Sequence, residues 1–185
     1  MGEEFVVSTT VLKRYPCHAT AHAAVKAVRE LQAEHGFTGA QVEAITVTGN
    51  QRVVERHNIL EPADLMLAQY SVPFCVALAL YREARDPESF DEAALADPQI
   101  RALCRRVRLV PEPAGQHGGM ASTVTITLTD RRRFECRAEN GMLKPGEIAD
   151  KFLRLTRAAL GQDNAATLYE RVQGLEDEEN VDWLT

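Results

Sequence analysis

Residues 124–136, VTITLTDRRRFEC, contain the pattern that sets the fold class of this chain. Apolar side chains occupy alternate positions on both sides of Asp130: Val124, Ile126 and Leu128 before it, Phe134 and Cys136 after it. Alternation with a period of two is typical of a strand that buries one face and exposes the other. Asp130 and its neighbours form the polar turn. The stretch therefore predicts a β-hairpin.

Two further strands are predicted upstream of the hairpin. The first has β-branched residues at positions 42, 45 and 47 and ends at Gly49-Asn50. Val53-Val54 are expected to continue it after a turn. The second covers residues 107–110 and is closed by Pro111.

A long helix is predicted before the first of these strands. Residues 17–34 carry apolar side chains at three- and four-residue spacing. Pro16 fits the first turn of such a helix, because proline lacks an N–H that the first turn does not need. Gly36 is well placed to end it.

Two more helices are predicted between the strands. Ser71 caps a helix over residues 72–83 that is apolar on almost every side and is therefore expected to be buried. Asp97 and Pro98 open a shorter helix that runs through Cys104.

The last part of the chain has a helical pattern throughout. Residues 148–160 place large apolar side chains at helical spacing, and Asp163 or Asn164 is expected to cap a final helix through Val172. The sum is an α+β fold, a two-layer sandwich of a mainly antiparallel sheet and packed helices, followed by C-terminal helices. The corresponding domains are residues 1–140 and 141–185.

Composition and charge limit the kinds of partner. A hydrophobic content of 45% is typical of a soluble globular protein, and a net charge of −6 argues against nucleic acid as a partner. The longest apolar run, residues 72–81, is too short to span a membrane and contains Pro73. Four widely spaced cysteines without a C-x-x-C pair indicate reduced thiols and so a cytoplasmic location.

Side chains that can bind ligands or take part in catalysis are concentrated in residues 13–22, KRYPCHATAH. On a helix, His18 and His22 would share a face and offer two ligands to zinc, but the glutamate of an H-E-x-x-H site is missing. Cys17 beside a histidine offers a nucleophile with its base, but neighbouring helical residues point about 100° apart. Both interpretations stay open.

A third interpretation of the same residues is electrostatic. Lys13, Arg14, His18 and His22 converge near a helix N-terminus, where free N–H groups and the helix dipole favour an anion. A lysine and histidines would hold a carboxylate, stabilise charge that develops on it and move a proton next to it. The remaining alternative is an ordinary helix start, in which the histidines only cap the helix and pack against neighbouring side chains. The spacing of the residues alone does not distinguish these interpretations.

The order of motifs along the chain adds a resemblance to a known family. KRYPCHATAH resembles the segment K-x-[YF]-P-x-x-x-x-T-H of the MmgE/PrpD family, which includes 2-methylcitrate dehydratase, cis-aconitate decarboxylase and iminodisuccinate epimerase. Further segments resemble family motifs in the same order: VEAITV (42–47), EP (61–62) with AQYSVPF (68–74), Asp97-Pro98 with Leu103 and Val107, and Gly141 with Pro145 and Lys151-Phe152. The resemblance covers nearly the whole chain.

The resemblance implies a chemistry and a site. It implies a lyase or isomerase that removes a proton or CO₂ next to a carboxylate of a small di- or tricarboxylate, and then eliminates, reprotonates or epimerises without metal or organic cofactor. By this resemblance Lys13 and His18 line the active site and are expected to be catalytic, and His22 matches a later family histidine. His22 and, from the electrostatic interpretation, Arg14 are expected to bind substrate. A tyrosine used by the decarboxylase branch is replaced by Val53 or Val54 in an ungapped comparison.

The resemblance also implies a missing partner. Members of the family carry an N-terminal helical domain that supplies further acid–base residues and against which the C-terminal helices pack. We therefore expect this chain to be a subunit of a split enzyme or a domain of a longer one, completed by a helical partner chain or by association with itself. Neither nucleic acid nor a membrane is an expected partner. The alternative is a non-catalytic binding or scaffold module descended from the family.

Overall fold

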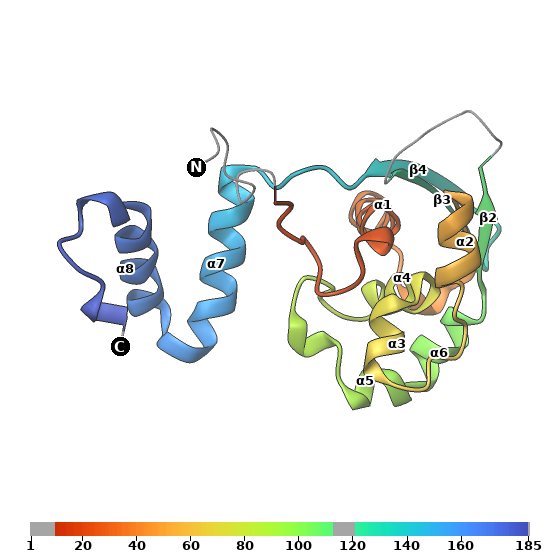
Figure 1. Ribbon diagram of the computed structural model, residues 1–185. Coiled ribbons are helices and arrows are strands. Elements are labelled where there is room, and N and C mark those ends of the chain that lie inside the picture. Colours follow the sequence, from red (N-terminus) through yellow and green to blue (C-terminus); the bar gives the residue numbers. More distant parts are fainter. Residues whose placement is uncertain (1–9, 113–120, 185) are drawn as a thin grey trace. The chain divides into compact units, whose positions relative to one another are not determined.

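The computed structural model describes residues 10–112 and 121–184 (Figure 1). The chain divides into two compact units, the larger being Leu12–Gly141 and the smaller taking in Met142–Thr185. Each unit is described by itself. Residues 1–9, at the start of the first predicted domain, lie outside the described residues.

The larger unit is built on a four-stranded sheet with the order β2-β1-β3-β4. Its strands are β1 (Val42–Gly49), β2 (Val107–Pro111), β3 (Ala121–Leu128) and β4 (Arg133–Glu139). β1 is parallel to β2 and antiparallel to β3, and β3 is antiparallel to β4. The predicted α+β fold with a mainly antiparallel sheet is confirmed.

The hairpin predicted from residues 124–136 is formed by β3 and β4. Ile126 pairs with Phe134 and Val124 with Cys136, so the alternating apolar residues of both strands lie on one face. Along β3 every second side chain is buried. In the turn, Arg131 adopts the left-handed conformation with φ of 70°, and the Arg132 N–H donates to Asp130 Oδ1 at 3.0 Å.

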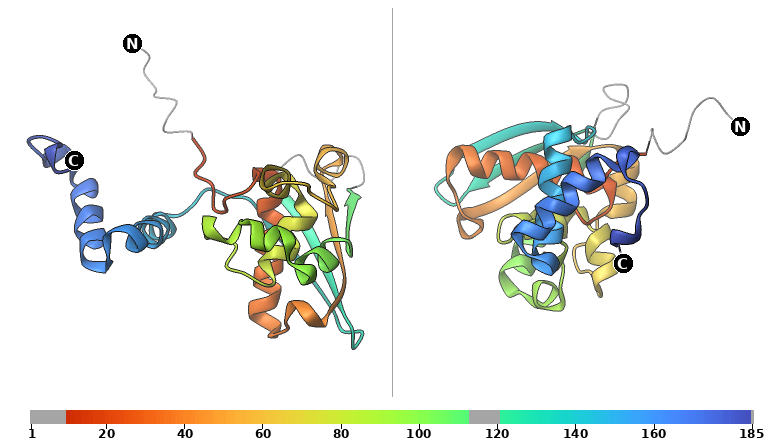
Figure 2. Two further views of the ribbon diagram at one scale, coloured as in Figure 1. Left: turned by 90° about the horizontal axis from the view of Figure 1, so that it is seen from below. Right: turned by 90° about the vertical axis from the view of Figure 1, so that its left-hand side faces the viewer.

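Two helices cover the buried face of the sheet (Figures 1 and 2). α1 (His22–His35) packs against β3 and β4, and α4 (Val72–Ala79) packs against α1, β2 and α6 (Pro98–Cys104). Every residue of α4 is buried, as its apolar sequence predicts. The Ser71 hydroxyl accepts from the Phe74 N–H at 2.9 Å and donates to the Ile59 carbonyl. Ser71 therefore caps α4, as predicted.

Shorter elements connect these parts. They are η2 (Ala19–Ala21), η3 (Gly39–Gln41), α2 (Gln51–His57), α3 (Leu65–Tyr70), η4 (Pro87–Ser89) and α5 (Glu92–Ala96). α2 ends at His57 and α3 ends at Tyr70.

Three local predictions in the larger unit were wrong. Val53 and Val54 lie in α2 and not in a strand, because the Asn50 side chain accepts from the Arg52 N–H at 2.8 Å and starts a helix. The helix predicted over residues 72–83 ends at Ala79. The helix predicted from residue 17 begins only at Ala19 as a short 3₁₀ turn and at His22 as an α-helix, because His18 is still extended.

The smaller unit consists of two helices followed by short turns. α7 (Pro145–Leu160) and α8 (Gln162–Gln173) pack against each other, with the rings of Phe152 and Tyr169 5.5 Å apart. η5 (Leu175–Asp177) and η6 (Asp182–Leu184) follow. The predicted cap at Asp163 or Asn164 was wrong. Gly161, with φ of 78°, stands before α8, and the Asn164 amide donates to the Leu160 carbonyl at the end of α7.

Candidate carboxylate-binding site

The segment that leads into η2 is anchored in the core by alternate residues. Tyr15 and Cys17 are buried, whereas Lys13 is exposed and Arg14 and His18 are half-exposed. The His18 N–H donates to the Gln69 carbonyl at the end of α3 at 2.9 Å. This bond keeps His18 in an extended conformation and fixes the segment against a second element.

The His18 ring is held in a stack of aromatic side chains. Its centroid lies 4.5 Å from that of His57 at the end of α2, with 28° between the planes, and 4.7 Å from that of Tyr70 at the end of α3. Three elements far apart in the sequence therefore position this imidazole. His57 and Tyr70 were missed in the sequence, where nothing links them to His18.

The hydrogen bonds of the two imidazoles define their tautomers. His18 Nδ1 accepts from the Thr20 N–H at 3.4 Å and lies 2.9 Å from the Thr20 hydroxyl, so the proton of neutral His18 is placed on Nε2. His57 Nδ1 lies 3.0 Å from the Tyr70 carbonyl oxygen, which can only accept. Neutral His57 therefore carries its proton on Nδ1 and a lone pair on Nε2.

Positive charge gathers around His18. Burial lowers the pKa of His18 below its usual value, and the charges of His57, Lys13 and His22 lower it further. His18 thus stays neutral to lower pH than an ordinary histidine. An anion placed among these groups would relieve the repulsion between them.

His22 does not share a surface with His18. It is 2% exposed, its ring meets that of Tyr15 edge-on at 5.3 Å, and its Nδ1 lies 3.3 Å from Asn140 Oδ1. Its Nε2 is buried without a hydrogen-bond partner in the part of the chain that the structure describes. His22 therefore lies beneath the segment, and the prediction that it binds substrate stays a prediction.

Cys17 contacts a second thiol in the core. Its pKa is lowered to about 6 by a hydrogen bond with Cys75, against the opposing effect of burial, and His22 and Lys13 lower it further. Burial and Cys17 raise the pKa of Cys75. Of this coupled pair, Cys17 loses its proton first.

The geometry removes the basis of the zinc interpretation. The shared face of His18 and His22 required a helix through residue 18, but His18 precedes the helix. Within residues 10–112 and 121–184, no group of three histidine, cysteine, aspartate or glutamate side chains is arranged to hold a metal ion.

The described residues also contain no helix that is long and apolar enough to cross a membrane.

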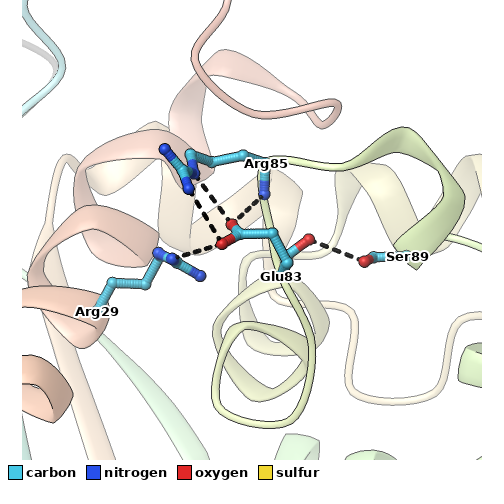
Figure 3. A network of polar contacts seen from close by, with 4 residues as sticks. All are labelled: Arg29, Glu83, Arg85 and Ser89. Carbon is cyan, nitrogen blue, oxygen red and sulfur yellow. Dashed lines mark hydrogen bonds and ion pairs between the residues drawn. The ribbon is translucent and has the colours of Figure 1, made fainter. Parts of the chain in front are cut away.

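A hollow of about 410 Å³ lies elsewhere in the larger unit, between residues of α1 and the segment that follows α4. Its arginines are neutralised, Arg29 by Glu83 and Arg82 by Asp91, each at 2.9 Å. Glu83 also accepts from the Arg85 side chain, and its carbonyl accepts from the Ser89 hydroxyl (Figure 3). None of the predicted site residues lines this hollow, and the paired charges indicate a structural role for it.

Replacing Glu83 with glutamine should lower the free energy of unfolding at pH 7 by about 1 kcal/mol. Burial alone would raise the pKa of Glu83, but hydrogen bonds from Arg85 and the charge of Arg29 hold it below its usual value. A lowered pKa stabilises the fold above the ordinary glutamate pKa, and that stability is lost as the pH falls through the folded value. Urea unfolding measured from pH 7 to pH 3 should therefore show that the free energies of unfolding of the wild type and of Glu83→Gln converge as the pH falls.

A matched control is Glu61→Gln. Glu61 is also paired, with Arg105 at 2.9 Å, but both side chains are half or more exposed. Its replacement should change the free energy of unfolding less than that of Glu83. Equal effects of the two changes, or an effect at Glu83 that does not depend on pH, would contradict the assignment of Glu83 as the centre of a stabilising network.

The fold and the site together define an α+β domain with a basic segment, called here the cationic corner, just before its first helix. The cationic corner consists of Lys13, Arg14 and His18. Residues 15–177 match the model of the MmgE/PrpD C-terminal domain, so the chain belongs to this family. A relative is the 2-methylcitrate dehydratase of Cupriavidus necator, which is 28% identical over 141 residues. The match covers 68% of this chain, and it spans only 28% of the length of that relative.

Proposed function

We propose that this chain contributes the carboxylate-binding corner of a lyase or isomerase of the MmgE/PrpD type. The supporting observation is the fixed position of His18, with Lys13 close enough for its charge to lower the pKa of His18. The substrate is a small di- or tricarboxylate, and the reaction starts by removal of a proton or CO₂ next to a carboxylate. The name of the relative, a 2-methylcitrate dehydratase, is consistent with this substrate class.

The proposed roles follow from the charge and hydrogen-bonding capacity of each group. Lys13 binds the carboxylate and stabilises the negative charge that develops on it, and His18 donates its Nε2–H to the same charge. Arg14 supports binding by its charge. His22 supports it indirectly, by lowering the pKa of His18. The reaction as proposed uses no metal or organic cofactor.

The proposed partners are the substrate and a helical chain or domain that completes the site, or a second copy of this chain. A cytoplasmic location is proposed because all four cysteines are free thiols, which a reducing compartment preserves. Nucleic acid is not proposed as a partner, since the net charge is −6.

The test is reconstitution. The chain is co-expressed with a candidate helical MmgE/PrpD chain from the same source, and the purified complex is assayed on a panel of di- and tricarboxylates. Turnover by the complex, absent from either chain alone, is the expected result. Carboxylate binding without turnover in any complex would favour the non-catalytic module, and a chain that binds no carboxylate, alone or in a complex, would contradict the proposal.

A further inference from the structure

His57 is the part of the site that neither its sequence context nor the family resemblance assigns. It is the last residue of α2 and is 9% exposed. Its ring is stacked on that of His18 at 4.5 Å and lies 6.0 Å from that of Tyr70. A histidine can pack in this way for structural reasons alone, so its hydrogen bonds and charges decide what it can do.

The hydrogen bonds give the two stacked rings opposite capacities. Neutral His57 donates from Nδ1 to the Tyr70 carbonyl, which leaves a lone pair on Nε2. Neutral His18 accepts at Nδ1 from the Thr20 N–H, which leaves an N–H on Nε2. Neutral His57 thus offers a proton acceptor at Nε2, and neutral His18 offers a proton donor at Nε2. No hydrogen-bond partner of His57 Nε2 is found within the described residues.

We propose that His57 is the proton acceptor of this site and acts through Nε2, beside the proton donor His18. The proposal deepens the proposed function and rests on it for the identity of the substrate. The tautomers of the two rings and the effect of His57 on the pKa of His18 do not depend on the proposed function, because they are properties of the chain without substrate.

Electrostatic repulsion disfavours a positive charge on His18 in this environment. The titratable groups that act on His18 are His57 from α2, Lys13 from its own segment and His22 from α1, and each adds positive charge. Two imidazolium rings at 4.5 Å would repel each other strongly beside a lysine. A positive charge on His57 therefore opposes protonation of His18.

The proposed step balances as a proton transfer. The C–H bond next to the substrate carboxylate breaks, its proton binds His57 Nε2, and its electron pair passes into the carboxylate, where Lys13 and His18 Nε2–H stabilise the charge. Protonation of the same carbon on its opposite face, by a proton from solvent, completes an epimerisation, and His57 releases its own proton to solvent. In a dehydration, the electron pair instead expels the neighbouring hydroxyl, which leaves as water with the proton from His57.

The variant His57→Asn separates the chemical role from the structural one. The asparagine amide nitrogen occupies the place of imidazole Nδ1, so it can still donate to the Tyr70 carbonyl, but it provides no base at the position of Nε2. His35→Asn is the matched control. His35 lies at the other end of α1, where its ring is stacked on Phe134 at 3.9 Å.

The experiment is nuclear magnetic resonance of the chain labelled with nitrogen-15 in its histidines, followed over a pH titration. We expect neutral His57 to carry its proton on Nδ1 and neutral His18 on Nε2. In His57→Asn the pKa of His18 should rise towards the ordinary value of about 6.5, and in His35→Asn it should stay in place. The opposite tautomer at His57, or a pKa of His18 that ignores the substitution, would overturn the proposal.

Two further measurements separate this proposal from the proposed function. Citrate, added as the probe, should shift the His18 and His57 signals. If citrate causes no shift, while the expected tautomers and the effect of His57→Asn on the pKa of His18 are both observed, the result counts against the carboxylate site alone. In an active complex, His57→Asn should lower kcat by roughly 100-fold or more with little change in KM. An active complex whose kcat does not change would remove His57 from proton transfer.

Discussion

Replacing Phe74 with alanine should lower the free energy of unfolding of the larger unit by about 3–5 kcal/mol. Phe74 is 1% exposed and is among the largest fully buried side chains. It lies in the first turn of α4, where its N–H donates to the Ser71 cap and its ring contacts that of Phe90 at 6.5 Å. The truncation would leave a cavity in a helix that has no exposed side and cannot turn towards solvent.

The measurement is urea unfolding followed by far-UV circular dichroism. Tryptophan fluorescence is unsuitable, because the single tryptophan, Trp183, belongs to the smaller unit. The matched control is Met66→Ala on α3, a large apolar side chain that is 64% exposed, whose loss should cost less than about 0.5 kcal/mol. A loss of less than about 1 kcal/mol at Phe74 would show that α4 is not the centre of the core.

The strands could be predicted where local pattern and tertiary burial agree. In β3 the alternation of Val124, Ile126 and Leu128 with threonines matches a sheet that buries only one face, so the sequence period and the fold carry the same information. Val53 and Val54 show the opposite case. Two β-branched residues are too few to define a period, and the cap from Asn50 outweighed their propensity for strands.

The site could be predicted only as far as its residues lie together in the sequence. Lys13 and His18 are five residues apart and were found by composition and by family resemblance. His57 and Tyr70 reach His18 because α2 and α3 end beside it, which depends on contacts between distant parts of the chain. Local spacing carries no signal of such contacts.

The error about His18 and His22 has a physical cause. Spacing of four implies a shared face only if both residues are helical, and the bond from the His18 N–H to the Gln69 carbonyl keeps residue 18 extended. The same departure from the helix brings His18 to the ring of His57 and leaves His22 buried against Tyr15. The local irregularity is thus what separates the two histidines into different environments.

In an active complex, Lys13→Ala and His18→Ala should each lower kcat/KM by about 100- to 10,000-fold. Each change removes a group that binds and stabilises negative charge as it develops. Lys26→Ala is the control for the lysine. Lys26 lies on α1, 3.8 Å from the Glu30 carboxylate on the exposed surface, and its loss should leave turnover unchanged.

A second variant tests what His18 contributes. The glutamine amide nitrogen occupies the place of imidazole Nε2, so His18→Gln keeps a donor there and should retain more activity than His18→Ala. Burial and the surrounding charges lower the pKa of His18, so its ring stays neutral to lower pH than that of an ordinary histidine. If Lys13→Ala and His18→Ala leave turnover of the active complex unchanged, this corner is not the site of the chemistry. If His18→Gln is as inactive as His18→Ala, His18 does not act through its Nε2–H.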